Sequence, residues 1–201
     1  MVLLIPDDEA ELRRLIQATF DLEDFVAFAY SSVDVSDSIE YTGHRMIVNP
    51  EAFAGRSEET VVSILAHEML HVASRYSAGP FVPFFVDEGI AEYVGTAGDP
   101  GSLDFFTGDV AAGNFDGRLP EDYQFTVGTG TEIYRSYQKS HSAVRFFVDR
   151  WGLRAFIRFY RLLGSKSLVP GTARYHLSRS LTKVTGLDLD AFEKAWADSI
   201  T

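Results

Sequence analysis

The sequence predicts an α+β fold with a small N-terminal β-sheet and a mainly helical C-terminal lobe. Two segments rich in aromatic and β-branched residues, 24–31 and 39–48, are typical of strands. After residue 131, apolar residues recur mostly at helical spacing. The length of 201 residues and the hydrophobic content of 46% suit one domain. We therefore expect a single domain over 1–201, with an N-terminal lobe at 1–95 and a C-terminal lobe at 96–201.

The elements of the N-terminal lobe are predicted in the order helix, strand, strand and helix. Pro6 and the acidic residues after it precede an amphipathic pattern over 7–20, which predicts a helix. The two strands follow, and Asn49-Pro50 ends the second. Ser57 is a candidate N-cap for a helix that runs to about residue 76, because acidic residues in its first turn favour the helix dipole.

The later elements are separated by glycine and proline. Gly79-Pro80 follows the helix that starts after Ser57 and prevents it from continuing. A short helix is predicted over 84–94. The stretch 96–130 has many Gly, Asp and Thr residues and no sustained periodicity, so we expect a long irregular segment there. Further helices are predicted over 131–150, 153–163, 172–184 and 188–199.

Composition and charge exclude several classes of protein. The chain has 18 Lys and Arg residues against 29 Asp and Glu residues, a net charge of −11. Such a charge disfavours nucleic acids and anionic membrane surfaces as partners. The absence of cysteine excludes disulfides, thiol nucleophiles and Cys-ligated zinc. No apolar run reaches the roughly 18 residues of a membrane span, so we expect a soluble chain without membrane insertion. The oligomeric state stays open, and so does the compartment, cytoplasmic or exported after loss of a signal.

The segment His67-Glu68-Met69-Leu70-His71 is an H-E-x-x-H motif inside the helix predicted after Ser57. Histidines four residues apart share one helix face and can bind one metal ion. Glu68 lies beside that face, where it can act as general base on a metal-activated water. The flanking residues are largely apolar, and polar groups on a buried helix need a partner, which a shared metal supplies.

A third ligand is expected on a nearby helix, because catalytic zinc usually takes three protein ligands and keeps one open position. The predicted helix over 84–94 carries two acids four residues apart, Glu88 and Glu92. Sixteen residues separate His71 from Glu88, enough for a turn at Gly79-Pro80 and a return to the first helix. The predicted cofactor is therefore Zn²⁺.

H-E-x-x-H followed by E-G-x-A-E resembles the gluzincins, the glutamate zincins of the peptidase MA-like group of zinc metallopeptidases. The resemblance implies a zincin-like fold. It implies zinc ligation by His67, His71 and Glu88. It also implies that Glu92 contacts and orients His67. The resemblance is strong over about residues 60–95 and weak beyond them.

Two further segments bear on the activity that the resemblance implies. Tyr137 begins Tyr-Gln-Lys-Ser, similar to the Y-E-K-G segment whose tyrosine stabilises the transition state in the related aminopeptidases. Tyr134 is the reserve candidate for this role, because it lies three residues earlier on the same predicted helix. The aminopeptidases also carry G-x-M-E-N upstream, and the matching region, residues 43–49, lacks its glutamate. An endopeptidase is therefore slightly favoured.

Two functions are compatible with these residues. The first is a zinc-dependent peptidase that acts on a peptide or protein substrate, with Glu68 and Tyr137 as catalytic residues. The second is a catalytically silent zincin-like domain that binds a peptide or protein partner in its cleft. Glu68 favours the enzyme, because a binding module needs no general base beside the metal.

Other polar residues have simpler interpretations. His141, His44 and His176 are expected to be packing residues, and Asp87 an exposed acid. Arg150, Arg154, Arg158 and Arg161 recur at helical spacing opposite an apolar stripe, which predicts a solvated face that balances the acidic surface.

Overall fold

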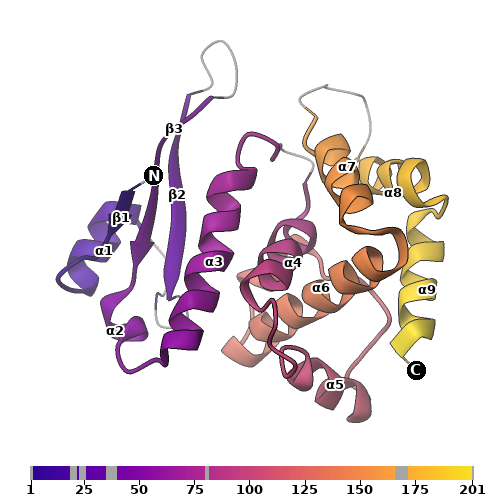
Figure 1. Ribbon diagram of the computed structural model, residues 1–201, viewed down its shortest axis with the longest axis horizontal. Coiled ribbons are helices and arrows are strands. Elements are labelled where there is room, and N and C mark those ends of the chain that lie inside the picture. The colour runs from indigo at the N-terminus through magenta and orange to yellow at the C-terminus, as the bar shows by residue number, and fades with distance from the viewer. Residues whose placement is uncertain are drawn as a thin grey trace. The chain divides into compact units, whose positions relative to one another are not determined.

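The structure is a computed structural model that describes residues 2–18, 22, 26–34, 40–79, 82–165 and 172–200 (Figure 1). It is α+β and mostly helical with a three-stranded sheet, which confirms the predicted class. The chain forms two compact units. The first contains residues 1–76 and 94–97, and the second contains 77–93 and 98–201.

The sheet of the first unit has the strand order β1-β3-β2. Strand β1 (Val2–Leu4) runs parallel to β3 (Glu40–Val48), and β2 (Ala27–Asp34) runs antiparallel to it. The sequence predicted β2 and β3 but not β1, whose three residues are too few for a visible alternation. The expected start of β2 at residue 24 lies outside the described residues.

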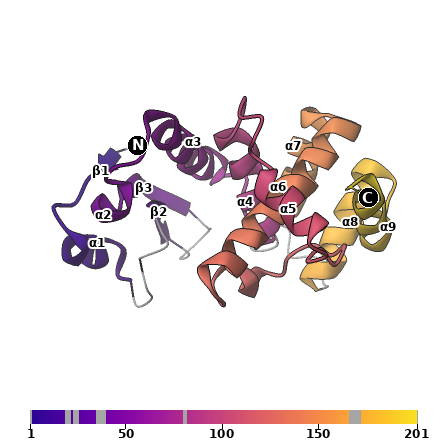
Figure 2. The ribbon, with the colours of Figure 1, turned by 90° about the horizontal axis from the view of Figure 1, so that it is seen from below.

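Helices cover both faces of this sheet (Figures 1 and 2). Helix α1 (Glu9–Ile16) is capped by Asp8 and packs Leu12 against Leu22 and Ile47 in a fully buried cluster. It is shorter than the predicted 7–20, because Gln17 adopts a left-handed conformation and ends it. Residues 19 and 20 of the predicted helix lie outside the described residues.

Helix α3 (Glu58–Ser74) packs on β2 and β3, on the other face of the sheet. The Ser57 side chain accepts a hydrogen bond from the backbone N–H of Thr60, as the predicted N-cap requires. A short helix that the sequence did not predict, α2 (Pro50–Phe53), precedes it. The two candidate metal ligands His67 and His71 therefore lie on a capped helix held against a sheet.

The described residues of the second unit form helices joined by turns and irregular segments, and they contain no strand. Its helices are α4 (Phe84–Gly95), α5 (Asp104–Ala111), the 3₁₀-helix η1 (Asp122–Phe125), α6 (Gly130–Trp151), α7 (Leu153–Leu163), α8 (Ala173–Thr185) and α9 (Leu189–Ile200). The long helix α6 contacts α5, η1, α7 and α9. Aromatic side chains fill this core, with Phe147 and Trp196 almost fully buried.

The prediction of an irregular segment over 96–130 was wrong in part, because α5 and η1 lie within it. Helix α5 is held by partners far along the chain. Phe106 stacks on Trp196 with ring centroids 6.3 Å apart, and Asp109 forms an ion pair with Arg135. Such contacts leave no periodic signal in the segment itself.

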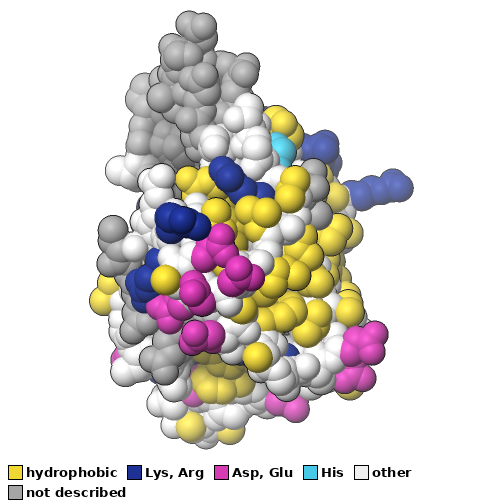
Figure 3. Space-filling model, turned by 90° about the vertical axis from the view of Figure 1, so that its left-hand side faces the viewer, with side chains coloured by type: hydrophobic (Ala, Val, Ile, Leu, Met, Phe, Trp, Pro, Cys, Tyr) yellow, Lys and Arg dark blue, Asp and Glu magenta, His cyan; other side chains and the backbone are white. Residues whose placement is uncertain are grey.

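Among the described helices, none is both long enough and apolar enough to cross a membrane. On the face drawn in Figure 3, hydrophobic side chains gather beside a group of acidic ones. Among the described residues of the first unit, the exposed large apolar ones are Val2, Leu3, Ile5, Val62, Met69 and Tyr76.

Candidate metal centre

Helix α3 directs the imidazoles of His67 and His71 toward each other. Their Nε2 atoms are 3.1 Å apart, and their ring centroids are 4.9 Å apart at an interplanar angle of 69°. Two nitrogen ligands of a tetrahedral zinc ion are separated by about 3.3 Å, given Zn–N distances of roughly 2.0–2.1 Å. The spacing of the two nitrogens thus suits a shared metal ion.

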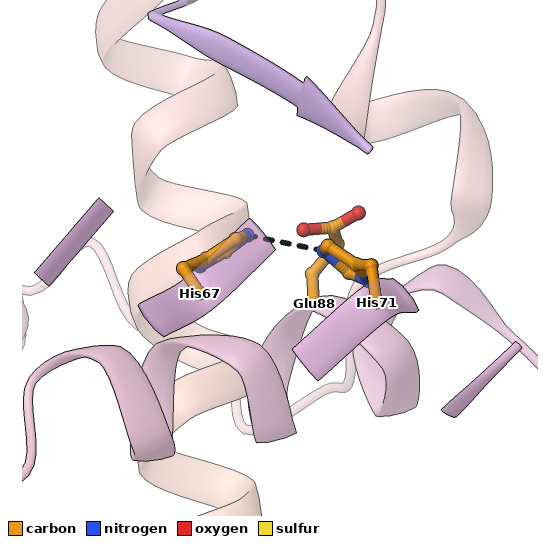
Figure 4. Close-up of side chains that lie close together, drawn as sticks. All are labelled: His67, His71 and Glu88. Atoms are coloured by element: carbon orange, nitrogen blue, oxygen red, sulfur yellow. Dashed lines mark hydrogen bonds between the residues drawn. The ribbon is translucent and has the colours of Figure 1, made fainter. Parts of the chain in front are cut away.

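A carboxylate completes this group of ligand atoms. One nitrogen each from His67 and His71 and one oxygen from Glu88 all lie within 4.8 Å of one another (Figure 4). All three side chains are half-buried. Two imidazoles and one carboxylate form a donor set typical of catalytic zinc, which leaves a fourth position open. Within the described residues, this is the group of His, Asp and Glu that could hold a metal ion.

The helix that carries Glu88 is fixed at its start by a capping contact. Oδ1 of Asp122 accepts a 2.8 Å hydrogen bond from the backbone N–H of Phe84, the first residue of α4. This N–H has no acceptor within its own helix. The capping acid comes from η1, 38 residues further along the chain, so the sequence alone did not reveal it.

Close backbone packing then sets the position of α4. A Cβ atom on Gly89 would lie 2.7 Å from the carbonyl oxygen of Ser140 in α6 and 2.7 Å from a methyl of Val144. A Cβ atom on Gly95 would lie 2.8 Å from the carbonyl oxygen of Ser63 in α3. The glycine after Glu88 is therefore required for close approach to α6, and Gly95 allows the end of α4 to approach α3.

Asp87, the residue before Glu88, is held by a tyrosine of another helix. Its Oδ1 accepts a 2.5 Å hydrogen bond from the hydroxyl of Tyr160 in α7. Tyr160 is 6% exposed and Asp87 is half-buried, so this contact is partly shielded from water. The sequence suggested an exposed acid at Asp87. The structure instead gives it a structural contact beside the candidate metal ligand.

The other two predicted acids are also half-buried. Glu68 follows His67 directly on α3, and Glu92 lies one turn after Glu88 on α4. The charge of Glu92 acts on two residues of α6, Tyr134 and His141. The contact between Glu92 and His67 that the resemblance implies stays a prediction.

The two candidate tyrosines on α6 differ in their surroundings. The ring of Tyr137 is half-buried and meets Phe125 edge-on, with centroids 5.3 Å apart. Tyr134 is 47% exposed. Burial of its hydroxyl raises the pKa of Tyr134, and the charges of Glu92 and Asp99 add to that increase. Both hydroxyls remain candidates for hydrogen-bond donation to a developing oxyanion.

The remaining histidines have structural surroundings. His141 is 2% exposed, and its Nδ1 has no hydrogen-bond partner among the described residues. Burial lowers the pKa of His141, although the charge of Glu92 opposes that effect. His44 is close to the hydroxyls of Ser31 and Tyr76, at 2.8 and 3.1 Å from its two ring nitrogens. His176 contacts the ring of Tyr175.

No family model, curated protein or solved structure matches this chain. The function of the protein is therefore inferred from its own residues and from the geometry of His67, His71 and Glu88.

Proposed function

We propose that this protein is a zinc-dependent peptidase of the gluzincin type, with an endopeptidase slightly favoured over an aminopeptidase. The observation that carries the proposal is the group formed by His67, His71 and Glu88, whose ligand atoms lie within 4.8 Å of one another. Glu68 adds a carboxylate next to the first ligand in the chain. A group that combines three metal ligands with an adjacent general base meets the requirements of metal-assisted hydrolysis.

Each residue has a separate role in this proposal. His67, His71 and Glu88 hold the zinc ion, which when bound would lower the pKa of water to about 7 and polarise a carbonyl group. Glu68 accepts a proton from the attacking water and returns it to the leaving amine as the C–N bond breaks. The hydroxyl of Tyr137 donates a hydrogen bond to the oxyanion that forms.

Supporting residues keep this arrangement in place. Glu92 orients His67, as a carboxylate partner of a metal-bound histidine commonly does. Tyr160 and Asp122 hold α4 through Asp87 and the N–H of Phe84. Preorganised ligands bind metal more tightly, because less side-chain freedom is lost on binding.

Metal analysis combined with a peptidase assay tests the proposal. We expect about one zinc ion per chain after zinc loading and dialysis, as a three-ligand site implies. We also expect cleavage of a quenched-fluorescent peptide library that stops on chelation and returns with zinc. Less than about a tenth of an equivalent of bound metal would contradict the metal site. Stoichiometric zinc without hydrolysis would contradict the peptidase and favour the catalytically silent binding domain.

A further inference from the structure

The charge of this chain is distributed very unevenly. Residues 150–187 contain eight basic residues and no acidic residue. The rest of the chain contains the other 10 basic residues and all 29 acidic ones. The net charge of −11 is therefore an average over a basic segment and a strongly acidic remainder. At physiological salt, charges more than about 8 Å apart are largely screened, so a partner at the surface responds to the local charge.

The basic segment begins with an amphipathic helix, α7. Its buried side carries Phe156, Phe159 and Leu163. Tyr160 lies toward the same side and bonds to Asp87 of α4. The opposite side carries three exposed arginines at helical spacing, namely Arg154, Arg158 and Arg161. This arginine face thus points away from the helix that bears Glu88, and it serves no role in the proposed hydrolysis.

The arginine face has no acidic partners in the part of the chain that the structure describes. The nearby ion pairs join Arg145 to Asp149 and Arg174 to Asp190, and the three α7 arginines take part in neither. The sequence predicted a solvated face here, and the three arginines are indeed exposed. Three exposed arginines without acidic partners on one side of a helix also form a site of concentrated positive charge.

Two exposed aliphatic residues lie along the edge of this face. Leu153 is 46% exposed and Ile157 is 41% exposed. Apolar side chains next to arginines suit a lipid interface, where aliphatic groups enter the acyl boundary and guanidinium groups bind phosphates. A nucleic-acid site would gain more from aromatic side chains that stack on bases. Neither Leu153 nor Ile157 can stack.

We propose that the arginine face of α7, formed by Arg154, Arg158 and Arg161 with Leu153 and Ile157, docks the protein on an anionic phospholipid surface. The association is peripheral and reversible, because the apolar side of α7 is already buried in the core of the second unit. The net charge of −11 predicted that the protein would avoid anionic membrane surfaces. Under this proposal, that prediction holds for the acidic remainder of the surface but not for the arginine face. This proposal is independent of the peptidase activity.

Vesicle co-sedimentation of the intact protein tests the proposal. We expect binding to phosphatidylcholine vesicles that contain about 30% phosphatidylserine and none to pure phosphatidylcholine, with affinity that falls as salt rises. Each arginine near such a surface contributes about five-fold in affinity. The R154A/R158A/R161A variant should therefore bind roughly 100-fold more weakly. The L153S/I157S variant should lose affinity as well, by about 3- to 10-fold.

A matched control distinguishes the effect of the arginine face on vesicle binding from the effect of the net charge of the whole chain. Arg14, Arg56 and Lys194 are exposed residues outside the arginine face. The R14A/R56A/K194A variant changes the net charge by the same amount and should bind like the wild type. An equal loss in both triple variants would overturn the proposal, as would the absence of wild-type binding to phosphatidylserine vesicles. Tighter binding to duplex DNA than to the vesicles, lost in R154A/R158A/R161A, would instead identify a nucleic-acid site.

Discussion

The hydroxyl of Tyr160 donates a 2.5 Å hydrogen bond to Oδ1 of Asp87, one residue before the candidate metal ligand Glu88. The two residues are 73 positions apart, so this contact ties α7 directly to the helix that carries the ligand. A hydrogen bond to a carboxylate is stronger than one between neutral groups. The bond therefore stabilises the second unit and limits the motion of the turn that contains Glu88.

Tyr160→Phe removes this hydroxyl without changing the shape of the ring. Hydrogen bonds to charged groups are worth about 1.5–3 kcal/mol, so the free energy of unfolding should fall by a similar amount. Urea denaturation measures this loss. Tyr123→Phe serves as the control, because Tyr123 is 59% exposed and its variant should unfold like the wild type. If both variants lost the same free energy of unfolding, the hydrogen bond to Asp87 would not explain the loss in Tyr160→Phe.

Glu68→Gln and Glu88→Gln distinguish the general base from the metal ligand. Glu68→Gln should retain about one zinc ion per chain and lose hydrolysis, because an amide of the same shape cannot accept the proton. Glu88→Gln should bind zinc much more weakly, since a neutral amide is a poor ligand for zinc. Zinc titration and peptide hydrolysis measure the two effects. Equal losses of metal in both variants would contradict this division of roles.

Glu92→Ala tests the orienting role that the resemblance implies. A carboxylate that holds a metal-bound histidine typically contributes 10- to 100-fold to metal affinity or activity. We expect a loss in this range, measured by zinc titration and by the rate of hydrolysis. Unchanged values for both would leave Glu92 without a role at the metal group.

Gly89→Ala probes the close packing of α4 on α6. The new Cβ atom would lie 2.7 Å from the carbonyl oxygen of Ser140, and the backbone there has little freedom to move. Such overpacking typically costs about 1–3 kcal/mol of stability. Gly108→Ala is the matched control, because Gly108 lies within α5 with no atom near its Cβ position. That variant should be more stable by about 0.5–1 kcal/mol. Thermal unfolding of both variants measures the contrast.

Local sequence patterns predicted the elements that carry the metal ligands. Ser57 and the acids that follow it marked the start of α3, and helical spacing placed His67 and His71 on one face. The predicted end of the helix over 153–163 agrees with α7, whose C-cap is Gly164. These features depend on neighbours within one or two turns, which the sequence displays directly.

The contacts that hold α4 in the second unit could not be predicted in this way. Asp122 caps α4 and Tyr160 binds Asp87 across 38 and 73 positions of the chain. Helix α5 was missed because its anchors, among them Trp196, lie in distant segments. Tertiary packing of this kind overrides local propensity and produces no periodic pattern.

Acid should weaken the pairing of Asp109 with Arg135. The hydrogen bond from Arg135 holds the pKa of Asp109 below its usual value of 3.8, although partial burial opposes this effect. A lowered pKa in the folded state contributes stability that is present above the unfolded pKa and lost as the pH falls through the folded one. Asp109→Asn should therefore be less stable than the wild type near neutral pH, with a difference that shrinks below pH 3.8.

Urea midpoints over this pH range measure the difference. Asp198→Asn is the control, because Asp198 and its partner Lys194 are 63% and 75% exposed. Exposed pairs of this kind contribute little, so its difference from the wild type should be small at every pH. A constant difference between Asp109→Asn and the wild type would show that the ion pair does not account for the stability of α5.

Tyr137→Phe and Tyr134→Phe decide which hydroxyl supports the oxyanion. Negative charge develops on the carbonyl oxygen during attack by water, and a phenolic hydroxyl aimed at that oxygen binds it more strongly in the transition state than in the ground state. Removing one such donor typically lowers kcat by about 100- to 1000-fold with little change in KM. We expect this pattern for Tyr137→Phe and only a small effect for Tyr134→Phe, measured by steady-state kinetics on a cleaved peptide. The opposite result would transfer the role to Tyr134. Full activity in both variants would show that neither tyrosine donates to the oxyanion.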